Sequence, residues 1–206
     1  MDVLIVVDVQ NDFCESGSLP VPNGSHVVPV INSIRGKFQE VYFSMDWHPQ
    51  DHASFFSNHE EGRAFSSIVY QKTGLELRLW PPHCIQNTEG SNFHKDLTVL
   101  PQDIIVKKGI NKDYDSFSAF GVEEDRTNLT ELLKSKQIGR VFCCGLAYDY
   151  CVGTTALDSA KQGYNTFVIT DACRSICPET ERIMTEQLLR ASINLVTSQD
   201  IQAILG

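Results

Sequence analysis

The sequence is short of basic residues. It has 17 lysines and arginines against 26 aspartates and glutamates among 206 residues, and its net charge is −9 at pH 7. A chain with this balance lacks the positive surface that attracts nucleic acids and anionic membranes. We therefore expect a small-molecule substrate, with neither a nucleic acid nor a membrane as partner.

Long apolar runs are also missing. The first run covers only residues 3–7, which is too short for a membrane span. Asp2 precedes it, so the run lacks the basic segment of a signal peptide. The seven cysteines form no C-x-x-C pair, which favours reduced thiols over a disulfide framework. From these absences we expect a cytoplasmic protein. The sequence leaves the number of chains open and is compatible with a homo-oligomer.

Two further absences narrow the function. No G-x-G-x-x-G or P-loop segment follows any apolar run, which counts against a nucleotide or flavin carrier, the alternative as a non-enzymatic α/β binding module. Without a partner cysteine at C-x-x-C spacing, a thiol redox protein is disfavoured as well.

What the sequence does have is an alternation of apolar and helical segments. Strands are predicted at 3–7, 41–45, 104–106, 141–145, 166–169 and 193–196, and helices at 25–38, 128–136, 153–162, 178–192 and 198–205. Unbroken apolar runs are typical of strands covered on both faces. The pattern predicts a single α/β domain over 1–206, with a mostly parallel six-stranded sheet and helices on both faces.

Residues 47–101 interrupt this alternation. The segment contains no convincing strand, yet it holds five of the six histidines and several aromatic residues. A long irregular segment inside a compact domain is usually functional or disordered, and the aromatic content argues against disorder. We expect an irregular insertion, and its histidines make it a candidate metal-binding segment.

Reactive side chains follow four of the predicted strands: Asp8, Asp46, Lys108 and Cys151. The carboxyl ends of parallel strands meet at one edge of a sheet, where ligands bind. A thiol needs a base for its proton and a cation for the thiolate, which Asp8 and Lys108 could supply. The helix expected after Cys151 would favour the thiolate and offer free N–H groups to an oxyanion. Lys107 remains a rival of Lys108, because only one of the two can face the site.

A second group of residues could hold a metal ion. Asp46 and His48 lie two apart on an extended segment, so both point the same way. His83, in a Pro-Pro turn, could supply a third ligand, with His52 as an alternative or outer ligand. Two histidines and a carboxylate suit Zn²⁺, Fe²⁺ or Mn²⁺. Phe13 and Trp80 could form an aromatic slot, or either could be ordinary core.

The motifs in this order resemble those of the isochorismatase-like cysteine hydrolase superfamily, and within it those of the nicotinamidases. The matching stretches are 8–13 (DVQNDF), 46–52 (DWHPQDH), 80–84 (WPPHC), 108–109 (KG) and 145–152 (GLAYDYCV). The resemblance implies hydrolysis of nicotinamide to nicotinate and ammonia through a cysteine thioester, in NAD salvage. The nearest rival is another amide or ureido hydrolase of the superfamily, whose members lack the full metal set.

The resemblance also assigns residues that spacing leaves open. The family lysine precedes a glycine, which selects Lys108, so that Asp8, Lys108 and Cys151 are the implied catalytic residues. It implies an oxyanion hole from the N–H groups of Ala147 and Cys151, and a cis peptide between Leu146 and Ala147. It implies one divalent metal ion, zinc before iron or manganese, on Asp46, His48 and His83. The implied substrate-binding residues are Phe13, Trp80, Leu146 and Phe117. Tyr148 stands where relatives usually have threonine and Tyr150 at a variable position, and either ring could narrow the pocket.

Overall fold

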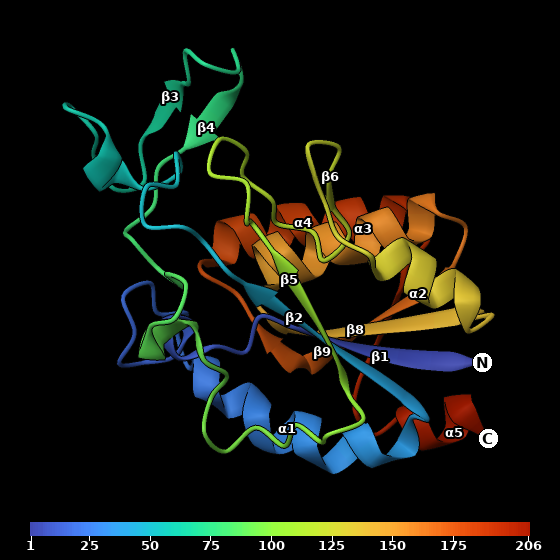
Figure 1. The fold of residues 1–206 in the computed structure, drawn as a ribbon. Helices are drawn as coiled ribbons and strands as arrows, with labels where there is room; N and C mark the ends of the chain where they lie inside the picture. The colour runs from blue at the N-terminus through green and yellow to red at the C-terminus, as the bar shows by residue number, and fades with distance from the viewer.

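A six-stranded parallel sheet runs through the centre of the computed structural model, which describes residues 1–206 (Figure 1). Its strand order is β10-β9-β8-β1-β2-β5. The strands are β1 (Asp2–Val7), β2 (Glu40–Asp46), β5 (Ile104–Lys108), β8 (Arg140–Leu146), β9 (Asn165–Arg174) and β10 (Asn194–Val196). All six predicted strands are confirmed, and so is the parallel sheet.

Helices cover both faces of the sheet, as predicted. One face carries α1 (Val27–Ile34) and α5 (Ile201–Leu205), and the other carries α2 (Leu129–Ser135), α3 (Gly153–Lys161) and α4 (Pro178–Arg190) (Figure 1). Short 3-10 turns occupy Asn11–Phe13, Gly24–His26, Arg35–Lys37, Phe56–Asn58 and Glu89–Ser91. No helix is both long and apolar enough to cross a membrane.

The centre of the core is β1, which pairs with β2 on one side and with β8 on the other. Its residues 3–7 are at most 1% exposed, because helices lie over both faces of this strand. Beside it, Gly145 sits at a register shift in β8 with φ at +116°, and a Cβ there would lie 2.1 Å from the carbonyl oxygen of Val7. A glycine is therefore required for β8 to approach β1 this closely.

The segment 47–101 contains regular structure that the sequence did not predict. Strands β3 (Ser67–Val69) and β4 (Glu76–Arg78) form an antiparallel hairpin that projects from the body of the molecule (Figure 1). Each strand has three residues, and Val69 and Leu75 are 67% and 55% exposed, so no apolar pattern marks them. A second small ladder, β6 (Gly121–Val122) with β7 (Asp125–Arg126), was also not predicted.

The topology places two of the predicted catalytic residues beside one crevice. From β1 the chain continues to β2 and β5 on one side of the sheet, and the later strands β8, β9 and β10 fill the other side. Such a reversal opens a crevice at the carboxyl ends of the strands. Asp8 follows β1 directly, and Cys151 follows β8 within a π-helical turn, Tyr148–Val152.

Candidate active site

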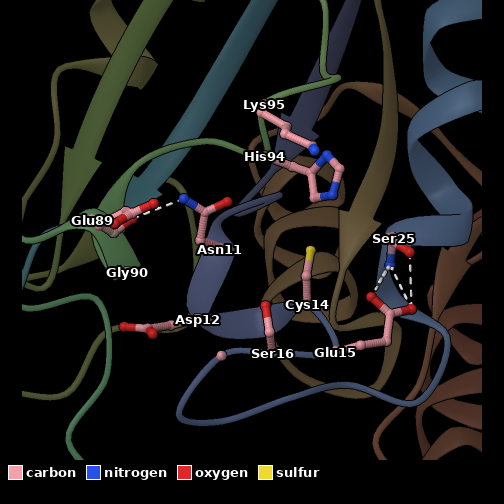
Figure 2. Close-up of a pocket in the computed structure, with 11 residues that line it drawn as sticks. Asn11, Asp12, Cys14, Glu15, Ser16, Ser25, Glu89, Gly90, His94 and Lys95 are labelled. Carbon is pink, nitrogen blue, oxygen red and sulfur yellow. Dashed lines mark hydrogen bonds between the residues drawn. The ribbon is translucent and has the colours of Figure 1, made fainter.

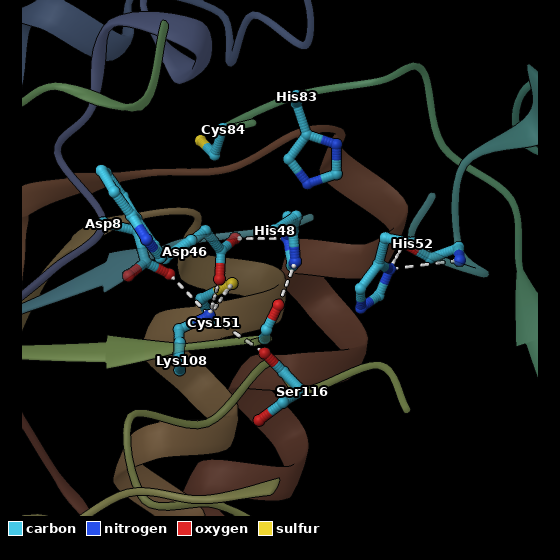
Figure 3. Close-up of polar contacts among 12 residues, drawn as sticks. Asp8, Asp46, His48, His52, His83, Cys84, Lys108, Ser116 and Cys151 are labelled. Carbon is cyan, nitrogen blue, oxygen red and sulfur yellow. Dashed lines mark hydrogen bonds and ion pairs between the residues drawn. The ribbon is translucent and has the colours of Figure 1, made fainter. Parts of the chain in front are cut away.

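The Lys108 ammonium is the hub of the predicted catalytic group (Figure 3). Its Nζ lies 2.5 Å from Asp46 Oδ1, 3.0 Å from Asp8 Oδ2 and 3.0 Å from the carbonyl oxygen of Ser116. The Cys151 Sγ is 3.6 Å from the same nitrogen. Lys108 is 1% exposed, and its two carboxylates raise its pKa well above the ordinary value against the cost of burial. The Lys108 side chain is therefore protonated and positively charged at neutral pH.

Strand alternation decides between the two neighbouring lysines. Lys107 points to the opposite side of β5, where its Nζ lies 3.5 Å from the ring centroid of Trp47 in an exposed cation–π contact. Lys108 points into the crevice. The structure thus brings Asp8, Lys108 and Cys151 together, and it leaves Lys107 outside.

Asp8 is held so that one carboxylate oxygen faces the thiol. The Ser44 hydroxyl donates a hydrogen bond of 2.7 Å to Oδ1, which leaves Oδ2 beside Lys108. Carboxylate oxygens of Asp8 and Asp46 and the Cys151 sulfur all lie within 4.8 Å of one another. Burial raises the pKa of Asp8 to about 6, although Lys108 pulls it down. A carboxyl with this pKa can take and return a proton near neutral pH.

The Cys151 thiol differs from the sequence prediction in one respect. It lies at the strand-to-helix turn, as predicted, but its pKa is raised well above the ordinary value, because burial outweighs the attraction of Lys108 and the two carboxylates repel a thiolate. The resting group is therefore a thiol. As a nucleophile this thiol would need a base at the moment of attack, and Asp8 lies within reach.

Backbone N–H groups surround the thiol in the turn. The Leu146–Ala147 peptide is cis, as the resemblance implied. The N–H of Ala147 donates no hydrogen bond, and that of Cys151 donates to no acceptor outside its own turn. The N–H of Ala147 is therefore available to an oxyanion, and that of Cys151 is the second donor that the resemblance implies. The Leu146 side chain is fully buried and does not line the cavity, so it is not placed to touch a substrate.

Asp46, His48 and His83 converge on one point (Figure 3), with one ligand atom from each lying within 4.8 Å of the others. His48 Nδ1 is 2.8 Å from the carbonyl of Gly109, and His83 Nδ1 is 2.7 Å from that of Pro81. Each Nδ1–H is therefore a donor, and each Nε2 keeps its lone pair. Asp46 uses Oδ1 on Lys108 and has Oδ2 3.6 Å from His48 Nε2. This donor set fits a divalent metal ion.

The charges at this corner favour a cation as well. Burial would raise the pKa of Asp46, but Lys108 and His48 outweigh it and hold that pKa below its usual range. Burial and the nearby His48 lower the pKa of His83 to about 4, so its ring is neutral and can act as a ligand. Gly109 completes the arrangement, because a Cβ there would lie 2.3 Å from the His48 ring.

His52 is buried beside the group but turned away from it. Its Nδ1 accepts from the Ser54 N–H and lies 2.8 Å from the Ser54 hydroxyl, and its Nε2 lies 3.2 Å from the carbonyl of Tyr114. Both ring nitrogens are therefore used. The ring packs 4.4 Å from His48, so His52 supports a ligand and is not placed as one.

The substrate cavity is mostly apolar. Its lining combines the predicted Phe13, Trp80, Phe117, Ala147 and Cys151 with Leu19, Val21, Asp115, Ser116, Tyr150 and Ile176, beside Asp46, His48 and His83. Tyr150 narrows it, with its ring 5.2 Å from Trp80. Tyr148 does not line it. Its hydroxyl lies 2.8 Å from that of Thr185 on α4, and the ring is buried on that side.

Several supporting residues escaped the sequence analysis. Gln10 clamps Asp46 by two backbone hydrogen bonds of 2.8 Å, one to its carbonyl and one from its N–H. Asp149 accepts hydrogen bonds from the N–H groups of Ile176 and Cys177 and so ties the π-helical turn to the start of α4. Gln10 lies within the 8–13 motif, and Ser44 is a lone hydroxyl in an apolar strand. These two features of the sequence were the only indications that Gln10 and Ser44 support the site.

A second cavity lies on the other side of the Asn11–Phe13 turn (Figure 2). It is larger, about 630 Å³, and its lining is almost entirely polar, with Asp12, Glu15, Glu89, His94 and Lys95 among it. None of the predicted catalytic or metal-binding residues reaches it. Asp12 separates it from the metal group, since its carboxylate accepts a 2.7 Å hydrogen bond from the N–H of Cys84, next to His83.

Comparison with known proteins gives one family match and several close relatives. A family model for the isochorismatase domain matches residues 2–200. The chain is 37% identical to a nicotinamidase of Acinetobacter baylyi over 96% of its own length and 93% of that protein. It is 36% identical to a nicotinamidase of Escherichia coli, over 98% of each chain.

Solved structures give the same answer. A nicotinamidase and pyrazinamidase of Acinetobacter baumanii superposes with a TM-score of 0.91 at 37% identity, over 97% of each chain. The yeast nicotinamidase bound to the inhibitor nicotinaldehyde gives 0.89 at 33% identity, over 96% of this chain and all of that one. A pyrazinamidase of Pyrococcus horikoshii in complex with zinc gives 0.78 at 33% identity, over 95% and 98%.

Proposed function

The chain belongs to the isochorismatase family, and from that premise we propose that it is a nicotinamidase, hydrolysing nicotinamide to nicotinate and ammonia through a thioester on Cys151. One observation carries the proposal: the Cys151 sulfur lies 3.6 Å from the buried Lys108 ammonium, which also holds Asp8 at 3.0 Å. Nicotinamidase relatives at 36–37% identity over nearly the whole chain support the choice of substrate.

In the first half-reaction Asp8 takes the thiol proton while the sulfur attacks the carboxamide carbon. The N–H groups of Ala147 and Cys151 hold the oxyanion, each contributing about 3 kcal/mol to transition-state stabilisation. Asp8 then gives the proton to the departing nitrogen, the C–N bond breaks, and ammonia leaves a nicotinoyl thioester. Lys108 keeps the carboxylates and the sulfur together as their charges change.

In the second half-reaction Asp8 takes a proton from water, which attacks the thioester carbon. The C–S bond breaks, Asp8 returns its proton to the sulfur, and nicotinic acid leaves and ionises to nicotinate. Phe13 and Trp80, which line the cavity, orient the pyridine ring of the substrate between them. Since nicotinate is a precursor of NAD, the reaction would serve NAD salvage.

Asp46, His48 and His83 would hold one divalent metal ion, and we propose zinc. The ion would supply a Lewis acid that fixes the pyridine nitrogen of the substrate. The Nε2 atoms of His48 and His83 and a carboxylate are ligands that zinc prefers. The zinc complex of the Pyrococcus horikoshii pyrazinamidase supports this choice.

The test is product analysis with a trapped intermediate. Purified protein should release ammonia and nicotinate in equal amounts from nicotinamide. In rapid-quench mass spectrometry the peptide that contains Cys151 should gain the mass of one nicotinoyl group. Absence of ammonia release from the metal-loaded protein would refute the function, and turnover with a label on another residue would refute the thioester at Cys151.

A further inference from the structure

The catalytic cavity has little free volume. It measures about 30 Å³, whereas pockets for small molecules generally measure about 300–1,000 Å³. The residues of its wall therefore decide what size of ring it admits. The wall on one side is a cluster of three rings, Trp80, Phe117 and Tyr150, whose centroids are 5.2, 5.6 and 6.3 Å apart.

A larger groove lies on the far side of this wall. Its volume is about 470 Å³, and it runs between the β3–β4 hairpin and residues 113–124. Two residues, Asp115 and Phe117, line both the groove and the catalytic cavity. Leu75, Glu76 and Arg78 at its rim are exposed, so the groove reaches solvent.

Of the three rings, only Phe117 also lines the groove. Trp80 is 4% exposed and is packed by Phe65 at 6.1 Å and by the Arg78 guanidinium at 5.3 Å, in addition to Tyr150. Phe117 is half-buried, and its other side faces the groove. Its side chain therefore stands between the two spaces.

We propose that cavity and groove form one substrate channel, and that Phe117 is the partition that sets the size of aromatic amide the enzyme takes. This inference rests on the proposed function and concerns its substrate range. With Phe117 in place, the site receives a single ring. With Phe117 removed, an amide with a second, fused ring places that ring in the groove. The charged residues that line the groove are Glu76, Asp113, Asp115, Glu124 and Arg78, so a fused ring without charge suits it.

The experiment compares nicotinamide with two neutral fused-ring amides, quinoline-3-carboxamide and isoquinoline-4-carboxamide, which extend the pyridine ring in different directions. For Phe117→Ala we expect the kcat/KM of one fused amide, relative to nicotinamide, to rise about tenfold or more over wild type, within the range of discrimination that hydrophobic pockets show. Phe117→Leu should give a smaller rise and replaces Phe117→Ala if that variant fails to fold.

Two control variants make the test specific. Phe65 packs on the outer side of Trp80 but lines neither space, so Phe65→Ala should keep the wild-type ratio. Ile176 lines the cavity but not the groove, so Ile176→Ala should give less gain than Phe117→Ala. An unchanged ratio in both Phe117 variants, or an equal gain in Ile176→Ala, overturns the inference.

Failure of the proposed function would look different. In that case wild type would release no ammonia from nicotinamide, whatever Phe117 does. The channel is then tested without turnover, by calorimetric binding of quinoline-3-carboxylate and isoquinoline-4-carboxylate to wild type and Phe117→Ala. At least tenfold tighter binding of one of them to the variant supports the channel, and equal binding of both overturns it.

Discussion

The two halves of the active site are built on different principles. Lys108 is the last residue of β5, and Asp8 and Cys151 follow β1 and β8, so the register of the central sheet fixes their positions. The metal group draws His83 from a loop without regular structure, and side-chain bonds to the backbone hold that loop. Examples are the bond from the Cys84 N–H to Asp12 and that from Gln86 to the Trp47 carbonyl.

This difference separates chemistry from binding. The sheet provides the sulfur, the base and the cation, which must keep their distances through both half-reactions. The excursion from the sheet, residues 47–101, provides His48, His83 and Trp80, whereas Phe13, Phe117 and Tyr150 of the aromatic lining come from other segments. Asp46 belongs to both, because its two oxygens face Lys108 and His48. Damage to the sheet group should therefore abolish turnover, and damage to the excursion should weaken binding.

The largest effect is expected at the thiol. Cys151→Ala and Cys151→Ser should lower kcat by about 10⁴-fold or more, because no other group can form the thioester. Nicotinamide should still bind, since the aromatic wall and the ion ligands are intact. Stopped-flow turnover and calorimetry measure the two separately. Cys177→Ser, at a thiol that does not line the cavity, is the control and should retain full activity.

The corresponding change in the excursion is His83→Ala. Substitutions of residues that merely hydrogen-bond to a metal ligand lower metal affinity by about 10–100-fold. Loss of a ligand itself should lower it at least as much, and it should raise the KM for nicotinamide. Metal content by mass spectrometry and KM of the variant check this. His94→Ala, in the polar cavity (Figure 2), is the matched control. A metal-free enzyme with unchanged KM would remove the ion from substrate binding.

The sequence predicts the sheet half better than the excursion. Unbroken apolar runs locate all six strands, and the residues at their ends follow from that. Spacing could not choose Lys108 over Lys107, and it offered His83 only as a possible third ligand with His52 as an alternative, so the resemblance was needed to assign both. The β3–β4 hairpin was not predicted because each of its strands has only three residues, too few to show an alternating pattern. The pKa of Cys151 was misjudged, because a helix terminus can be located in a sequence but the burial of a thiol among carboxylates cannot.

The base at the sheet edge gives a pH dependence. Asp8 must be ionised to accept the thiol proton, and burial raises its pKa to about 6. Protonation therefore removes activity as pH falls, and kcat/KM should drop about tenfold per pH unit below about 6. Assays from pH 4 to 8 in buffers that do not bind metal test this. A rate that stays flat to pH 4 would exclude Asp8 as the base.

Ser44 should tune this acid limb with a smaller effect. Its hydroxyl donates to Asp8 Oδ1 at 2.7 Å and stabilises the ionised carboxylate. Ser44→Ala should move the acid limb to higher pH, while Ser44→Thr keeps the donor and should leave it in place. Metal content is measured alongside, because Asp46 is two residues away. A limb that does not move in Ser44→Ala would assign the hydroxyl a purely structural role.

The smallest effects are expected at two tyrosines of the π-helical turn, of which one contacts the excursion and the other does not. Tyr148 packs toward α4 and its hydroxyl lies 2.8 Å from that of Thr185, whereas Tyr150 packs on Trp80 of the excursion. Tyr148→Phe should lower the free energy of unfolding by about 0.5–1.5 kcal/mol, the worth of one hydrogen bond. Because Tyr148 does not line the cavity, the KM for nicotinamide should stay within about twofold of the wild-type value.

Tyr150→Ala should instead raise the KM for nicotinamide, since the Tyr150 ring forms part of the cavity wall. Urea unfolding and steady-state kinetics on both variants separate the two effects. If Tyr148→Phe altered KM as strongly as Tyr150→Ala, the division between a sheet that performs the chemistry and an excursion that binds the ring would be wrong.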